Sequence, residues 1–337
     1  MRIFIIIIIL FILLLLFYNL SCREKKHITI PAWEYKGEPL FLNSWSDDFY
    51  GFPFQSLKTS SDKMLKICVI SAPLYQDDKK KYYKLKNQGY LMIGICSYGF
   101  YPYINEEDNK HDSRSSTLKD DEMQEIIKDI KGWLICGKNK LPYNVPQLLF
   151  SESDCPNIDF IKPKGLSKKY DIIYSAGSDA EFHKHHKNWE LAKKCFSEIS
   201  KKGFKILVIG IKKPSDLDLP NIDYKPFLNW HEFIDKIEES KIMFVPNISD
   251  ASPRILTESL CKGVPIACNK NIFGGWKYIN ENTGEFFTDE QDVMNCIYKI
   301  NSKNYDTRKW FLDNYFPNGE SKARKELGEF ILQLYKN

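Results

Sequence analysis

Residues 241–287 read KIMFVPNISDASPRILTESLCKGVPIACNKNIFGGWKYINENTGEFF, and this stretch decides the fold. Its first five residues form a short apolar run, which is typical of a parallel strand buried on both faces. Ser252 and Pro253 predict the start of a helix, because serine can cap free backbone N–H groups and proline tolerates the first helical position. Gly263, with Pro265 just beyond it, predicts where that helix ends.

Two carboxylates lie in this stretch, Asp250 in the predicted loop and Glu258 in the middle of the predicted helix. Open α/β sheets bind ligands in the crevice at the carboxyl ends of their strands, so we expect both side chains to face that crevice. The N-terminus of the helix offers free N–H groups and a partial positive charge, which suit a phosphate group.

The stretch resembles the donor-binding motif of the group 1 (family 4) retaining glycosyltransferases, which have the GT-B fold. The matching elements are Asp250, Ala251-Ser252-Pro253, Glu258, Gly263-Val264-Pro265 and Gly274-Gly275. The family usually has Glu at the first acidic position, where this chain has Asp. The resemblance implies that Glu258 hydrogen-bonds the ribose of a nucleotide-sugar donor. It also implies that Asp250 and nearby backbone amides contact the transferred sugar.

A second match lies upstream, where residues 170–177 are predicted as a strand and a helix follows Lys187. In the family, an Arg and a Lys after this strand clamp the donor diphosphate, and Lys187 matches that Lys. The Arg is absent, since Ser178 follows Gly177. A cation is needed because the leaving diphosphate gains charge as the glycosidic bond breaks. Residues that can substitute for the missing Arg are His183, Lys184, His185 and His186.

These matches assign Asp250 and Lys187 to catalysis. The residues assigned to donor binding are Glu258, Ser252, Arg254, Gly177, Lys184 and Phe227. The run His-Lys-His-His at 183–186 also suggests a metal, but its spacing matches no zinc pattern. No metal is required by the motifs, because Lys187 and a helix N-terminus can neutralise the diphosphate.

The N-terminus carries an unbroken apolar run from Ile3 to Tyr18. As a helix this run spans roughly 24–27 Å, enough for a thin bilayer, so we expect a single transmembrane helix within residues 1–22. A secretory signal peptide is the rival interpretation, although no small-x-small cleavage site ends the run. Cys22 after Ser21 also partly matches a bacterial lipidation site.

The side of the membrane on which the globular part lies is less clearly indicated. Basic residues follow the apolar run, Arg23, Lys25 and Lys26, and they weakly favour a cytosolic globular part. The cysteine count is nine, an odd number, and several cysteines lie inside predicted strands or helices, as free core thiols do. A luminal globular part remains an alternative.

The rest of the chain is expected to form two Rossmann-like α/β domains, an acceptor-side domain at 27–160 and a donor-binding domain at 168–337. In the first domain the predicted strands are 65–72, 89–98, 132–137 and 146–150, and the predicted amphipathic helix is 118–131. His111 lies in a polar loop and is interpreted as solvated rather than catalytic. In GT-B folds the last helix crosses back to the N-terminal domain.

The formal net charge of +4 is mild and spread along the chain, so it does not favour nucleic acid as a partner. We therefore interpret the chain as a membrane-anchored glycosyltransferase (hexosyltransferase class, EC 2.4). It would transfer a sugar from a nucleotide-diphosphate sugar to a glycan or lipid-linked acceptor, with retention. One alternative is an inactive GT-B protein that binds a sugar nucleotide or glycan, suggested by the missing Arg. Another is a membrane-tethered interaction protein without a ligand.

Overall fold

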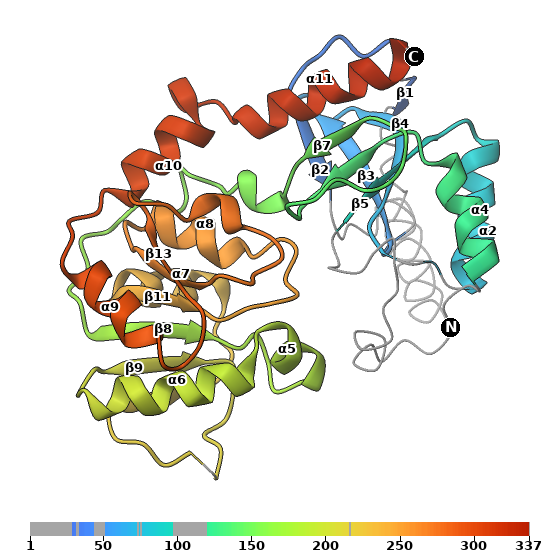
Figure 1. Cartoon of the computed structure of the whole chain (residues 1–337). Coiled ribbons are helices and arrows are strands. Elements are labelled where there is room, and N and C mark those ends of the chain that lie inside the picture. Colours follow the sequence, from blue (N-terminus) through green and yellow to red (C-terminus); the bar gives the residue numbers. More distant parts are fainter. Residues whose placement is uncertain are drawn as a thin grey trace, which may run out of the picture.

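The computed structural model describes residues 29–31, 34–43, 51–72, 74, 76–96, 120–215 and 217–336. Within them the chain forms two units, each built on a β-sheet with helices packed against it (Figure 1). The predicted membrane anchor at 1–22 and His111 lie outside the described residues. No helix in the described part of the chain is long and apolar enough to cross a membrane.

The C-terminal unit has a sheet whose strands all pair in parallel. Its strand order is β10-β9-β8-β11-β12-β13. These strands are β8 Tyr170–Ser175, β9 Ile206–Ile209, β10 Ile222–Lys225, β11 Ser240–Val245, β12 Ile266–Asn269 and β13 Gly284–Phe287. The strand order reverses between β8 and β11, which is where open α/β sheets bind ligands.

Helices cover both faces of this sheet (Figure 1). One core joins one sheet face to α7 Trp230–Glu238, α8 Arg254–Cys261 and α10 Thr307–Tyr315. A second core joins the other face to α6 Trp189–Lys201 and α9 Val293–Asn301. Burial on both faces explains the continuous apolar runs of β9 and β11, because neither face of these strands meets water.

The N-terminal unit has a mixed sheet, with the strand order β2-β3-β4-β5-β6-β7 and the short β1 paired in parallel with β4. The strands are β1 Thr29–Ile30, β2 Leu40–Asn43, β3 Phe54–Thr59, β4 Met64–Ile70, β5 Leu91–Ile95, β6 Trp133–Ile135 and β7 Gln147–Leu149. Strands β4 to β7 confirm the predicted ones; β5 to β7 lie within the predicted bounds, and β4 begins one residue earlier and ends two residues earlier than predicted. The antiparallel pairs β2–β3 and β3–β4 were not predicted.

Helices α2 Gln76–Asn87 and α4 Asp120–Asp129 lie side by side on the N-terminal unit (Figure 1). The amphipathic pattern of 118–131 correctly predicted α4, whose buried Met123 and Ile126 pack into the core of this unit. Helix α2 was missed because its sequence, QDDKKKYYKLKN, is mostly charged. Only a few of its residues, including Tyr82 and Leu85, are buried.

The chain passes twice between the units. It leaves the N-terminal sheet through the 3-10 turn η2 Glu152–Asp154, and it returns through α11 Lys322–Lys336 (Figure 1). Leu327 and Ile331 of α11 are fully buried in the core of the N-terminal unit. Gly328 allows this close packing, because a Cβ there would lie 2.4 Å from the hydroxyl of Tyr35. The final helix therefore crosses back, as the resemblance implies for a GT-B fold.

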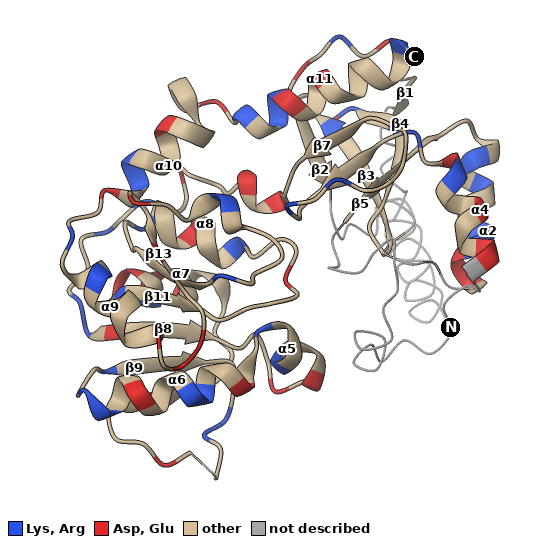
Figure 2. Ribbon diagram, in the orientation of Figure 1, with Lys and Arg blue, Asp and Glu red and all other residues tan. Residues whose placement is uncertain are grey.

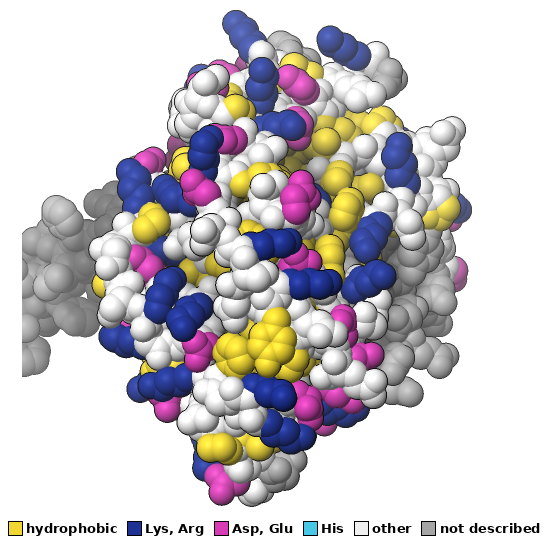
Figure 3. All heavy atoms as spheres, turned by 60° about the vertical axis from the view of Figure 1, so that its left-hand side comes forward, with side chains coloured by type: hydrophobic (Ala, Val, Ile, Leu, Met, Phe, Trp, Pro, Cys, Tyr) yellow, Lys and Arg dark blue, Asp and Glu magenta, His cyan; other side chains and the backbone are white. Residues whose placement is uncertain are grey.

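Charged residues are interspersed over both units in the ribbon view (Figure 2). On the face shown in Figure 3, basic and acidic side chains also lie next to one another. This mixture agrees with the mild net charge of the chain. The structure describes eight of the cysteines; all are free and all but Cys155 are buried.

Candidate active site

A cavity of about 410 Å³ lies at the carboxyl ends of β8, β9 and β11 in the C-terminal unit. This volume is within the range of small-molecule sites. Of the residues that the sequence assigned to catalysis and donor binding, all but Lys184 line it. They are Asp250, Lys187, Glu258, Ser252, Arg254, Gly177 and Phe227. The structure therefore brings together the two motifs, which are separated in sequence by the whole of β9, β10 and α7.

Lys187 and Asp250 form an ion pair at the centre of the site, between the loop after β8 and the loop after β11. Asn247 donates a second hydrogen bond to the same carboxylate oxygen of Asp250, with an Nδ2–Oδ2 distance of 3.0 Å. Burial alone would raise the pKa of Asp250, but the adjacent Lys187 outweighs it and holds this pKa below its ordinary value. The carboxylate is therefore charged at neutral pH.

Glu258 lies in α8, where only 8% of its surface is exposed. The indole Nε1 of Trp230 donates to its Oε1 at 2.8 Å, so the carboxylate is oriented from α7. Burial raises the pKa of Glu258, and the Trp230 hydrogen bond and the charge of Arg254 offset this only in part. A further hydrogen-bond donor would stabilise the charged form of this carboxylate, and a ribose hydroxyl is such a donor.

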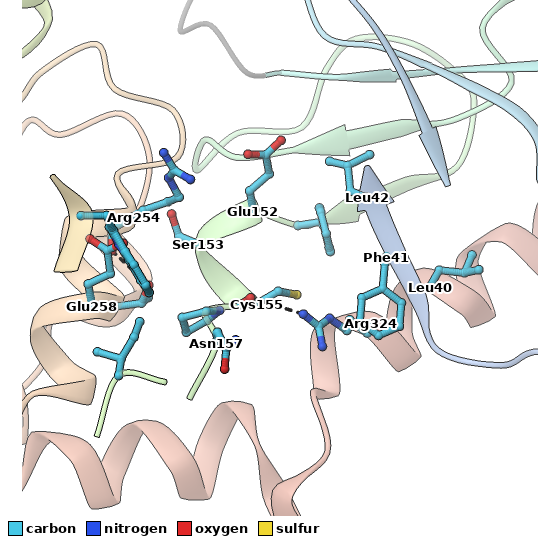
Figure 4. A pocket seen from close by; sticks show the side chains of 15 residues that line it. Leu40, Phe41, Leu42, Glu152, Ser153, Cys155, Asn157, Arg254, Glu258 and Arg324 are labelled. Atoms are coloured by element: carbon cyan, nitrogen blue, oxygen red, sulfur yellow. Dashed lines mark hydrogen bonds between the residues drawn. The ribbon is translucent and has the colours of Figure 1, made fainter. Parts of the chain in front are cut away.

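Arg254 begins α8 and is exposed. Its guanidinium makes no hydrogen bond or ion pair with the described residues. Burial raises the pKa of both Glu152 and Glu258, and the charge of Arg254 offsets part of that rise. Figure 4 shows Arg254 and Glu152 with their charged ends on the same side of a second cavity, of about 250 Å³, between the units. Arg254 is thus a cation available to a ligand.

The loop after β8 carries the glycine that the resemblance singled out. Gly177 has a φ of +80° and packs against Gly210, whose φ is +88°. A Cβ on Gly210 would lie 3.1 Å from the carbonyl oxygen of Gly177, so the two loops touch through backbone alone. Gly177 itself lines the cavity. Phe227 lies at the rim with 75% of its surface exposed.

The predicted capping role of Ser252 was wrong. The N-cap of α8 is Pro253, without a side-chain hydrogen bond, and the helix begins at Arg254. The hydroxyl of Ser252 instead binds the turn η2, with Oγ–Oγ distances of 2.7 Å to Ser151 and 3.1 Å to Ser153. These partners satisfy the hydroxyl, so it does not need the helix N–H groups. Sequence reasoning could not find them, because they lie about a hundred residues away.

The basic run that could replace the missing Arg forms a short helix, α5 Glu181–His186, rather than the predicted loop. Lys184 does not line the cavity, because it turns to Glu181 with an Nζ–Oε1 distance of 2.9 Å. The ring of His183 binds Ser178 at 2.6 Å. Burial and the charge of Lys187 lower the pKa of His183, so this imidazole is uncharged at neutral pH. Neither residue supplies the missing positive charge.

Sequence reasoning missed several residues at the site, Trp230, Asn247, Glu152 and Gln55. Asn247 lies three residues before Asp250, within a loop already implicated, and its position was the only available signal. Trp230 follows the predicted helix cap Asn229, which indicated a helix start but not the bond to Glu258. No cluster of three or more metal-ligating side chains occurs among the described residues.

Comparisons with known proteins find the fold but not a sequence family. No protein-family model matches the chain, and no curated protein matches it. Many solved structures do match. One is the pneumococcal O-GlcNAc transferase GtfA in complex with UDP and GlcNAc, with a TM-score of 0.51 and 8% identity. The match covers 88% of this chain and 70% of that one.

Two further matches have similar scores. Trehalose-6-phosphate synthase OtsA has a TM-score of 0.52 and 10% identity, over 76% of this chain and 70% of that one. The lipopolysaccharide outer core galactosyltransferase WaaB, in its apo form, has a TM-score of 0.50 and 12% identity. That match covers 79% of this chain and 75% of WaaB. The chain therefore has a GT-B-like fold of two Rossmann-like units, and the resemblance stated from the sequence is confirmed at the level of the fold.

Proposed function

We propose that this chain is a retaining glycosyltransferase that uses a nucleotide-diphosphate sugar and a glycan or lipid-linked acceptor. One observation carries the proposal. Lys187, at the end of α5, and Arg254 and Glu258, both of α8, line one cavity at the point where the strand order reverses. Two cations and a buried carboxylate suit a diphosphate and a ribose. The fold neighbours support the same activity, since one of them holds UDP and GlcNAc.

In this proposal Glu258 accepts a hydrogen bond from the donor ribose, and Trp230 keeps its carboxylate turned toward the cavity. A charged acceptor of this kind contributes about 1.5–3 kcal/mol. The ring of Phe227, exposed at the rim, offers an apolar surface to the nucleobase. Gly177 lets the donor approach the backbone of the loop after β8.

The diphosphate is bound by Lys187 and Arg254. Arg254 lacks a protein partner among the described residues, so it takes the place of the Arg that Ser178 replaces. Lys187 must exchange part of its contact with Asp250 for the phosphate oxygens. As the bond between the anomeric carbon and the phosphate oxygen breaks, negative charge grows on the leaving group, and both cations stabilise it.

Asp250 contacts the transferred sugar in this scheme. It is partly buried, charged and fixed by Lys187 and Asn247, so it can hold a sugar hydroxyl in one orientation. The acceptor hydroxyl then forms the new bond on the face that the diphosphate leaves, and its proton passes to the leaving phosphate oxygen. Orientation of this kind supplies a large share of a transferase's rate.

The second candidate is an inactive GT-B protein that binds a sugar nucleotide or glycan. The observation in its favour is that Ser178 stands where the family has Arg, while His183 nearby is uncharged. The two candidates differ in turnover. We expect the purified protein to release nucleoside diphosphate from at least one of a panel of UDP-, GDP- and ADP-sugars.

Binding without turnover would support the inactive protein and contradict the enzyme. Protection against thermal unfolding measures that binding, because a ligand specific to the native state raises the unfolding temperature. If no nucleotide or nucleotide sugar protects the protein, both candidates fail, and an interaction protein without a nucleotide ligand is the better account.

A further inference from the structure

A cavity of about 340 Å³ lies beside the donor cavity, on the side of the N-terminal unit. It shares with the donor cavity Lys187, Asp250, Ser252 and Arg254. Its remaining lining comes from both units and includes Phe52, Gln55, Glu152 and Phe182. A molecule in this cavity would lie next to Asp250, where the proposed function places the transferred sugar.

Gln55 of β3 is an unusual residue for the inside of a sheet, with only 3% of its surface exposed. Its Nε2 donates weakly to Oε1 of Glu152, at 3.5 Å. Its own Oε1 is buried and has no hydrogen-bond partner among the residues that the structure describes. A buried acceptor left without a donor costs about 1–3 kcal/mol. This cost would be recovered if a ligand hydroxyl donated to it.

Glu152 lies in η2, the turn that links the two units. Burial raises the pKa of its carboxyl, and the charge of Arg254 and the hydrogen bond from Gln55 only partly offset this. No basic side chain of the described residues forms an ion pair with it. The carboxylate of Glu152 and the amide of Gln55 are therefore neighbours, and each can still accept hydrogen bonds from a ligand.

The turn that carries Glu152 is bonded to the donor loop. The hydroxyl of Ser252 meets those of Ser151 and Ser153 on either side of Glu152, at 2.7 and 3.1 Å. The last residue of the turn, Asp154, is held as well: its Oδ1 accepts hydrogen bonds from Nζ of Lys277 at 2.7 Å and from the hydroxyl of Tyr278 at 2.6 Å. Glu152 is thereby held at a fixed place relative to Asp250, as a group that positions a substrate must be.

We propose that Gln55 and Glu152 bind the acceptor through two adjacent hydroxyls of a neutral pyranose. The inference rests on the proposed function and names its acceptor class. A carboxylate beside an amide matches a vicinal diol, because each hydroxyl can donate to one group while the amide N–H donates back. The aromatic residues Phe52 and Phe182 line the same cavity and offer apolar surface to the C–H face of a sugar ring.

An anionic acceptor fits this pair less well. A phosphate or carboxylate at Gln55 would lie beside the carboxylate of Glu152, and like charges at close range oppose binding. A single hydroxyl, as on a serine or threonine side chain, would leave one of the two groups without a partner. The neutral diol uses both.

The test measures binding of defined probes by saturation-transfer NMR titration, with UDP present. The probes are the methyl glycosides of glucose, galactose and N-acetylglucosamine, with glycerol 3-phosphate as the anionic probe. We expect at least one glycoside to bind, and Glu152→Gln and Gln55→Ala each to weaken it by about tenfold or more. Glu190→Gln is the matched control, because the Glu190 side chain is 77% exposed on α6 and its ion pair within the described residues is with Lys193.

Thermal unfolding of each variant checks that it is folded, and Glu152→Asp gives a second, milder variant that we expect to retain part of the affinity. The inference is overturned if no glycoside binds the wild-type protein. It is also overturned if both variants bind glycosides within about twofold of wild type, or if glycerol 3-phosphate binds more tightly than every glycoside. Failure of the proposed function would appear separately. In that case the wild-type protein would not cleave any nucleotide-sugar donor when water takes the place of the acceptor.

Discussion

In the C-terminal unit every described strand pairs in parallel. In the N-terminal unit the pairs β2–β3 and β3–β4 are antiparallel, and β4 pairs in parallel with β1 and with the set β5 to β7. A parallel sheet places the loops after its strands along one edge. Lys187, Asp250 and Glu258 follow such strands and meet in one cavity. The N-terminal unit contributes Gln55, which comes from the body of an antiparallel strand.

This difference affects how each half of the site is encoded. The proposed donor half is built from short contiguous motifs, since a strand, its loop and the next helix carry neighbouring residues to the same place. The proposed acceptor half is assembled from a strand, an interdomain turn and the shared loop, which are far apart in sequence. If the two halves divide the chemistry in this way, substitutions in the donor half should change donor turnover and donor binding.

The largest effect is expected for Lys187. Lys187→Ala should lower donor turnover by about 10²–10³-fold and donor affinity much less, because the charge on the leaving diphosphate grows in the transition state. Steady-state rates of diphosphate release, with affinity from calorimetry, measure both quantities. Lys184→Ala is the control, since Lys184 pairs with Glu181 outside the cavity. If Lys184→Ala strongly lowered donor turnover and Lys187→Ala left it unchanged, the catalytic role would belong to Lys184 and not to Lys187.

The next effect concerns Glu258. Glu258→Gln should weaken donor binding by about 1.5–3 kcal/mol, because it removes a charged acceptor for the ribose while keeping the shape of the side chain. Calorimetric titration with the donor measures the change. Glu198→Gln is a suitable control on the exposed face of α6, where the ion pair of Glu198 within the described part of the chain is with Lys201. An unchanged dissociation constant in Glu258→Gln would remove Glu258 from the donor site.

The pH dependence of donor binding should report the same carboxylate. Burial raises the pKa of Glu258, so its carboxylate protonates at a higher pH than that of an exposed glutamate. Donor affinity should therefore be constant at alkaline pH and fall as the pH drops through this raised pKa. Titrations between about pH 8 and about pH 5 measure it. Glu258→Gln should lose this step; persistence of the step would assign it to another group, such as the phosphates.

The sequence predicted the donor half well and the acceptor half only in outline. The apolar run 241–245, the acidic pair and Gly263 have local causes, and they indicated β11, the loop and α8 in the correct order. The capping role of Ser252 failed because its partners, Ser151 and Ser153, are distant in sequence. Strand β3 was missed for a related reason. Buried polar residues such as Gln55 and Ser56 break its alternation of apolar and polar residues, and their burial depends on the folded structure rather than on their sequence neighbours.

The smallest effect is expected at the N-terminus. We propose that residues 1–22 anchor the chain in a membrane, with the globular part in the cytosol. Deletion of residues 1–24 should then give a soluble protein whose donor turnover stays within about twofold of the full chain, since binding energy at a separate anchor acts mainly through local concentration. Carbonate extraction of the full-length protein checks the anchor. Release into the soluble fraction with a shortened N-terminus would indicate a cleaved signal peptide and contradict the cytosolic placement.

The central claim is that the cavity of the C-terminal unit holds a nucleotide-sugar donor, and a crystal structure with a bound nucleotide sugar tests it most directly. We expect phosphate oxygens within hydrogen-bonding distance of Lys187 and Arg254, about 2.7–3.2 Å, and the ribose on Glu258. A nucleotide bound elsewhere, or one whose diphosphate contacts neither Lys187 nor Arg254, would contradict the account.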